Sequence, residues 1–263
     1  MRLLGGQLRK LVHRPATRYT PVFLGAMLLL VYVGIAASRM QVTDAGARAD
    51  LDAQLRFPAV YELLAQVLIT MGGLAAATYA GMVRGGDWSW RTFGAVVARG
   101  ESRPRYVLTE FLAIALLVAA AFVALMAFGS ILAIVGALML GLGLGGATDA
   151  DTVAELGSMI LRGSYAMAIQ ASFGVAAAAV TRSPLAGVVV IVSLFIGEQI
   201  APIVIPSDVM AYAPIVTTMT IALGPGGSPG ETSDLIRSLL VGTAYGAVAL
   251  LIAAVASIRA ELE

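Results

Sequence analysis

The chain has no cysteine, one histidine (His13) and one lysine (Lys10) among its 263 residues. Without cysteine it can form no disulfide, thiol nucleophile or thiolate metal site. One histidine excludes the zinc motif HExxH, which needs two histidines on one helix face. The only lysine lies in Gln7-Leu8-Arg9-Lys10-Leu11, so the Gly-Lys-Ser/Thr of a phosphate-binding loop is missing. We therefore expect no intrinsic catalysis, no ATPase domain and no cofactor bound by this chain.

Charge is scarce as well. Charged residues make up 13% of the chain, against about 25% in an average protein, whereas 59% of the residues are apolar. A soluble domain of this length would need more charge to cover its surface. Apolar stretches of about 20 residues can instead face lipid, because a bilayer core of about 30 Å requires that length of helix. The composition predicts an all-α polytopic membrane protein.

Apolar runs and the breaks between them predict six transmembrane helices in a single transmembrane domain, 1–263. We expect spans at about 21–37, 61–83, 106–134, 156–180, 185–205 and 239–258. The third apolar run continues to Gly146. Its length is too great for one simple span and too small for two spans joined by a turn. We expect a long third helix ending near Ile134. Residues 135–146 either extend this helix or form a separate element at the membrane interface.

The basic residues are sorted along the chain. Twelve of the 17 fall before the first span, between spans two and three, after span four, or after span six. The other connections are acidic or balanced, including the expected extracytoplasmic loop 206–234. Because cytoplasmic loops carry an excess of Lys and Arg, both termini are predicted to be cytoplasmic. We expect a multi-pass protein of the cell (inner) membrane in contact with lipid, and no nucleic-acid partner, since the net charge is only +1.

Residues 1–19 are basic and contain an amphipathic stretch. Over residues 3–12, four apolar side chains share one helical face: Leu4, Leu8, Leu11 and Val12. This pattern predicts a cytoplasmic interfacial helix ended by Pro15, with a disordered basic tail as the alternative. A secretory signal also begins with basic residues and an apolar run, but five further spans follow here, so we expect a retained first helix.

The segment 84–105, between spans two and three, contains both tryptophans of the chain, Trp88 and Trp90. Asp87 follows a glycine pair and can cap a helix. Four residues beyond it then share one helical face: Trp90, Phe93, Gly94 and Val97. A short helix with an aromatic face can lie among lipid headgroups or dock in the groove of a partner protein.

In this segment and in its topology, the chain resembles the ABC-2 class of permeases, which are transmembrane subunits of ABC transporters. Members have six spans with both ends inside. Between spans two and three many carry an acidic residue, then Gly-Thr, and later a Gly-x-Ser-Arg-like stretch. Asp87, Arg91-Thr92 and Gly100-Glu101-Ser102-Arg103 stand at these places, and Tyr212-Ala213-Pro214 is similar to the outer-loop Tyr-Leu-Pro of the family. Arg91 departs from the glycine, and Glu110 lies where a lysine is usual.

The resemblance implies a coupling helix at about 87–99 that meets a separate ABC ATPase subunit, with ATP and Mg on that partner. The implied contact residues are Asp87, Trp88, Trp90, Arg91, Thr92, Phe93, Arg99, Glu101 and Arg103. It also implies a type V exporter bundle that pairs with a second permease copy or a homologous permease. On this interpretation, Phe93→Asp reduces ATPase association or transport and leaves membrane insertion intact.

Glu198 and Arg162 are ionisable residues inside the expected spans, where a charge costs at least about 2.5–3.5 kcal/mol. Glu198 is the deepest, and Arg162 lies near the outer end of the preceding span, so the two could pair. They would form either a structural ion pair or a polar lining of the substrate path. Glu110, one turn inside span three, is expected to reach the headgroups. The apolar piece 215–223 is too short to span and predicts a re-entrant or surface-lying helix.

These patterns favour the permease subunit of an ABC exporter. The alternative is a membrane scaffold or assembly factor that does not transport. A secondary transporter is less favoured, because charges at the membrane midplane are few and no internal repeat is evident. The sequence leaves open the substrate, the direction of transport, and the choice between homodimer and heterodimer.

Overall fold

The computed structural model describes residues 2–89, 92–224 and 232–260, and within these ranges it is built of helices without any strand. Six of the described helices are long and apolar enough to cross a membrane. They are α2 (Pro15–Gln41), α4 (Ala59–Ser89), α6 (Arg103–Leu140), α7 (Ala150–Thr181), α8 (Ala186–Ile200) with the short 3-10 helix η1 (Ala201–Ile203), and α11 (Thr232–Arg259). The prediction of an all-α multi-pass membrane protein is confirmed at this level.

Most spanning helices extend beyond the apolar runs that predicted them. α4 continues to Ser89, because polar residues form the same backbone hydrogen bonds of a helix as apolar ones. α6 has 38 residues, or roughly 57 Å at 1.5 Å per residue. The predicted end near Ile134 is wrong: α6 continues to Leu140 and ends at Gly141, whose φ of 68° is a left-handed helix stop. Residues 135–140 thus extend the helix, and residues 141–149 form a loop.

The two most buried spanning helices, α4 and α7, lie at the centre of the bundle. More than half of the residues in their apolar windows are buried, whereas only 17% are buried in the windows of α2, α8 and α11. α4 and α7 approach closely through small residues: a Cβ on Gly174 of α7 would lie 1.9 Å from the carbonyl oxygen of Ala77 on α4. Close backbone contact of this kind stabilises helix association where lipid removes the hydrophobic driving force.

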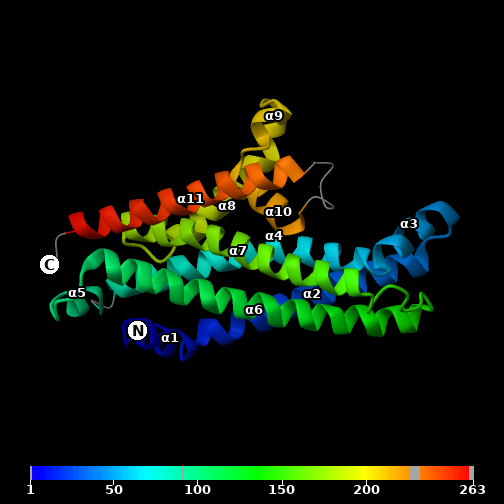
Figure 1. Cartoon of the computed structure of the whole chain (residues 1–263), viewed down its shortest axis with the longest axis horizontal. Helices are drawn as coiled ribbons and strands as arrows, with labels where there is room; N and C mark the ends of the chain where they lie inside the picture. The colour runs from blue at the N-terminus through cyan, green and yellow to red at the C-terminus, as the bar shows by residue number, and fades with distance from the viewer. Residues whose placement is uncertain (1, 90–91, 225–231, 261–263) are drawn as a thin grey trace.

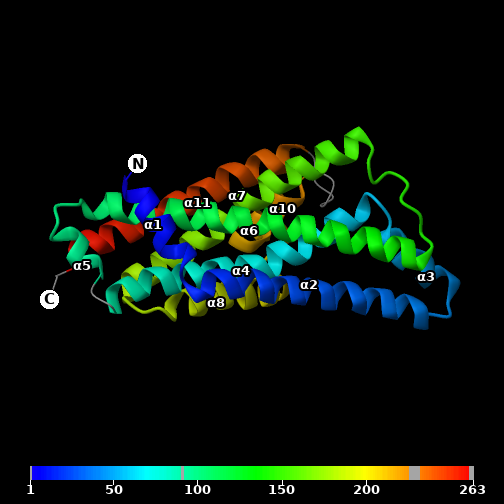
Figure 2. The ribbon, with the colours of Figure 1, turned by 90° about the horizontal axis from the view of Figure 1, so that it is seen from below.

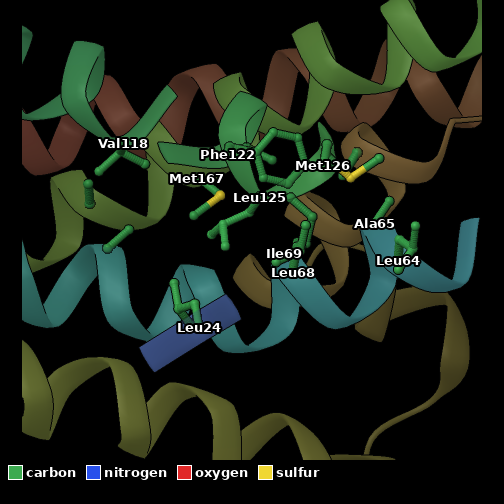
Figure 3. Close-up of a cluster of buried hydrophobic side chains, with 14 of the residues drawn as sticks. Leu24, Leu64, Ala65, Leu68, Ile69, Val118, Phe122, Leu125, Met126 and Met167 are labelled. Atoms are coloured by element: carbon green, nitrogen blue, oxygen red, sulfur yellow. The ribbon is translucent and has the colours of Figure 1, made fainter. Parts of the chain in front are cut away.

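The apolar core lies between α2, α4, α6 and α7. Figure 3 shows side chains from all four helices pointing toward one another in this region. The labelled residues are Leu24 of α2, Leu64, Ala65, Leu68 and Ile69 of α4, Val118, Phe122, Leu125 and Met126 of α6, and Met167 of α7. This core fixes the four helices relative to one another along much of the bundle.

The two ends of the bundle differ. Figures 1 and 2 show the short helix α5 (Thr92–Val97), the N-terminal helix α1 (Arg2–Val12) and both termini at one end, which we call the α5 end. The helix α3 (Ala45–Leu55) and the loop between α6 and α7 lie at the other, the α3 end. The helix predicted over residues 3–12 is confirmed as α1. Its Leu11 is fully buried and α1 packs on α6, so its apolar face is covered by protein, although Val12 stays exposed.

The segment after α8 folds back onto the bundle. The helix α9 (Ser207–Met210) projects from it, as Figure 1 shows, whereas α10 (Pro214–Leu223) packs against α4, α7, α8 and α11. α10 is the short helix expected over 215–223, and most of its residues are buried, so it does not lie on the surface. Part of the expected extracytoplasmic loop, residues 225–231, lies outside the described residues.

Candidate functional site

A cluster of polar side chains is buried near the α5 end, where α1, α4, α6 and α11 meet. We call it the α5-end cluster and define it as Gln7, Lys10, Arg14, Arg84, Asp87, Tyr106, Glu110 and Ser257. Arg84, Asp87 and Glu110 have no exposed surface. Removing a charge from water costs several kcal/mol unless partners compensate it. The pairing within this cluster therefore decides whether it stabilises or destabilises the fold.

Asp87 accepts hydrogen bonds from three directions. Lys10 Nζ lies 2.8 Å from Oδ2 and 3.1 Å from Oδ1, Arg14 Nη2 lies 3.1 Å from Oδ1, and the Tyr106 hydroxyl donates to Oδ2. The prediction that Asp87 caps a new helix is wrong, because Asp87 lies in the last turn of α4. The preceding glycines do not break α4: a Cβ on Gly85 would lie 2.4 Å from the backbone nitrogen of Pro184, so glycine allows a close contact there.

Arg84 connects three helices and the aromatic side chains beside them. Its Nη1 lies 3.3 Å from Oε2 of Glu110 on α6, and its Nη2 donates to the Ser257 hydroxyl on α11. The guanidinium carbon lies 4.5 Å from the ring centre of Phe93 and 5.5 Å from that of Trp88, which is cation–π geometry. Glu110 therefore does not reach the headgroups as expected. It is buried against Arg84, with Lys10 Nζ 3.8 Å from its other oxygen.

The aromatic residues of the predicted segment point inward. Phe93 is fully buried, and its ring centre lies 4.6 Å from that of Trp88 and 5.6 Å from that of Tyr106. The expectation that Phe93 belongs to an outward aromatic face is wrong, because Arg84 and Tyr106 offer it a buried environment. Trp88 is half-buried, and the guanidinium carbon of Arg182 lies 5.3 Å from its ring centre. Trp90 and Arg91 lie outside the described residues.

The remaining residues of the segment divide into exposed and internal ones. Arg99 is exposed, as are Ala95 on α5 and Ala98 just after it. Thr92, the first residue of α5, and Glu101 are half-buried, and Glu101 lies 3.8 Å from Arg105. Arg103 instead donates to backbone carbonyls that end α11, at 2.6 Å from Ile258 O and 2.9 Å from Ala260 O. Cations satisfy the unpaired carbonyls at a helix C-terminus, so Arg103 attaches α11 to the start of α6.

Glu198 and Arg162 do not pair, and that prediction is wrong. Glu198 accepts hydrogen bonds from the backbone nitrogens of Ile215 and Val216, at 2.7 and 2.9 Å. Arg162 lies 2.6 Å from Glu155 and donates to the carbonyl oxygen of Leu223 at 3.3 Å. The reason is that α10 folds back onto the bundle. The backbone at its start donates to Glu198, and the backbone at its end accepts from Arg162.

Sequence analysis did not propose Lys10, Arg14, Arg84 or Tyr106 as site residues. The available signals were that Lys10 is the only lysine and that Arg84 directly follows the apolar run of the second span. In the sequence both are also signals of topology, and their partners are distant: Asp87 lies 77 residues from Lys10, and Glu110 lies 26 residues from Arg84.

Comparison with known protein families and with curated proteins found no match to this chain. Among the described residues, no group of three or more His, Asp or Glu side chains is arranged to hold a metal ion. The site is thus characterised by its own geometry: a buried ionic cluster that joins the short helix α5 to the membrane-spanning bundle.

Proposed function

We propose that the chain is the transmembrane permease subunit of an ABC transporter, an ABC-2-like exporter powered by a separate ATPase subunit that holds ATP and Mg. The observation that supports this best is the attachment of α5. It lies beside the ends of α6 and α11, at the end of the bundle that holds both termini (Figure 1), and its Phe93 is buried among side chains of the α5-end cluster. A force applied to α5 would be passed to the bundle instead of bending a loop.

The connections of the cluster give this force defined routes. Phe93 of α5 contacts Arg84 of α4 and Tyr106 of α6. Arg84 in turn bonds Glu110 of α6 and Ser257 of α11, so the contact of α5 is connected to three spanning helices. Interactions of buried charged groups are strong and directional, which suits a rigid mechanical connection. In this proposal the α5 end faces the cytoplasm of a cell (inner) membrane, and the bundle works beside a second permease copy or a homologous permease.

The surface that would meet the ATPase differs from the one the sequence suggested. The exposed residues of the segment include Ala95, Ala98 and Arg99, and Arg99 gives this surface a positive charge, whereas Phe93 is turned inward. A basic face of this kind fits an acidic groove on the partner. Phe93→Asp would bury a carboxylate in the cluster and disturb the segment itself, so it does not separate docking from folding.

The test is a co-purification. The tagged chain, expressed with candidate ATPases encoded beside it, should bring down a phosphate-loop protein with vanadate-sensitive ATPase activity. Arg99→Glu should lower the recovered ATPase at least several-fold, because it reverses the exposed charge. Arg48→Glu, the same change at an exposed site on α3 at the opposite end, serves as the matched control. Equal recovery with both variants contradicts the proposed surface, and no ATPase in any preparation favours the scaffold alternative.

A further inference from the structure

We propose that α10 is a plug in the bundle whose two ends are held by opposite charges, Glu198 at its N-terminus and Arg162 at its C-terminus, and that releasing either charge opens the groove α10 fills. The plug is a conformational device separate from the α5-end cluster. It requires no ATPase partner, so it can hold or fail independently of the proposed function.

The N-terminus of α10 has no cap of its own. Its N-cap residue is Ala213, which makes no side-chain cap bond, and Pro214 at the first position has no N–H. The next two N–H groups, of Ile215 and Val216, both donate to the Glu198 carboxylate of α8. A carboxylate at this position satisfies two otherwise unpaired donors and faces the positive end of the helix dipole.

The C-terminus of α10 meets a cation. The Arg162 guanidinium of α7 donates to the carbonyl oxygen of Leu223, the last residue of α10. The next residue, Gly224, has φ of 75°, and a Cβ there would lie 2.6 Å from the guanidinium carbon. Only glycine combines this backbone conformation with so close an approach of the side chain. The cation therefore faces the negative end of the same dipole.

Between these ends α10 covers a polar group inside the bundle. Gln170 Nε2 of α7 donates to Thr218 Oγ1 of α10 at 2.8 Å, and both side chains are buried. The Gln170 amide lies against Gly73 of α4, where an added Cβ would be 1.5 Å from its oxygen. Removing α10 would leave this amide without its partner at the contact of α4 and α7. α10 thus closes a groove whose floor carries a polar group.

The length of α10 explains why its ends must be held. Ten residues span about 15 Å, half of a bilayer core, so α10 cannot anchor itself by crossing the membrane. It is attached to the bundle through the Gln170–Thr218 hydrogen bond, a weak contact from the Thr70 hydroxyl to the Met219 sulfur, a charged contact at each end and its apolar packing. Weakening one charged end should therefore increase the fraction of time that the whole helix spends away from the groove.

A cysteine reporter tests this directly, because the chain has no native cysteine. Ala222→Cys places a thiol on α10 at a fully buried position, and Ala133→Cys places one at a fully buried position on α6. Maleimide labelling of the purified protein in lipid vesicles should be slow at both sites. Adding Glu198→Gln or Arg162→Gln should speed labelling at residue 222 about tenfold or more and leave residue 133 unchanged.

Two further variants provide matched controls. Glu155→Gln removes the other, exposed partner of Arg162 and should leave labelling at residue 222 slow. Arg162→Lys retains the positive charge and should restore most of the protection that Arg162→Gln removes. Unchanged labelling at residue 222 in both Gln variants overturns the proposal. Equal acceleration at residues 222 and 133 also overturns it, because the two charges would then support the whole fold instead of α10.

Discussion

Asp87→Asn tests the α5-end cluster most sharply, because it removes one charge and hardly changes the shape of the side chain. Lys10 and Arg14, whose side chains are 27% and 16% exposed, would then both lose the carboxylate charge that they contact. Breaking a buried ion pair on one side costs about 3–5 kcal/mol. Because Asn still accepts from Tyr106 and Lys10 can turn partly toward water, we expect a loss at the lower end, about 3 kcal/mol of unfolding free energy.

The assay is reversible unfolding in mixed micelles, followed by circular dichroism, with a double-mutant cycle. Lys10→Met retains most of the side-chain stem and removes the charge, and alone it should cost about 1 kcal/mol. The double variant Lys10→Met, Asp87→Asn should lose about 1–2 kcal/mol less than the sum of the two single losses, because the Lys10–Asp87 pair can be lost only once. Arg105→Gln, at an exposed ion pair, should change stability by less than about 0.5 kcal/mol. Losses that add fully would refute the direct Lys10–Asp87 interaction.

Two other predictions concern different parts of the fold. Gly174→Val should destabilise the bundle by about 2 kcal/mol or more, because its Cβ would lie 1.9 Å from the Ala77 carbonyl oxygen, whereas Gly34→Ala, with open space around it, should be nearly neutral in the same unfolding assay. The hydrogen bond from Arg39 lowers the pKa of Asp52 on α3 below its usual value. The carboxylate therefore stabilises the folded chain above about pH 4, and the stability difference from Asp52→Asn should shrink as the pH falls further. A pH-independent difference would contradict the ionic contact.

The sequence contains enough information to predict the spans, because hydrophobicity is a property of each stretch by itself. The ends of the helices are harder to predict, because they also depend on contacts with distant residues. α4 continues past the apolar run through Arg84 to Ser89, since tertiary partners make that turn favourable. Arg84 looked like the first residue of a loop, yet its partners Glu110 and Ser257 lie 26 and 173 residues away.

The errors at the candidate sites have the same physical origin. Glu198 and Arg162 are charges at membrane depth that need partners, and the predicted pair between them is wrong because α10 supplies partners to both. Periodicity placed Phe93 on a helical face but could not decide which face is covered. That depended on the aromatic and cationic side chains that α4 and α6 bring to the same place.

Lys10 gives the protein a built-in chemical probe. It carries the only side-chain amine of the chain, and that amine is held 2.8 Å from a carboxylate oxygen of Asp87. The contacts with Asp87 and Tyr106 occupy this amine, so an amine-selective acylating reagent would modify Lys10 slowly while they persist. The rate of acylation at this one residue, followed by mass spectrometry in the unaltered protein, would report how often the N-terminal helix α1 separates from the bundle.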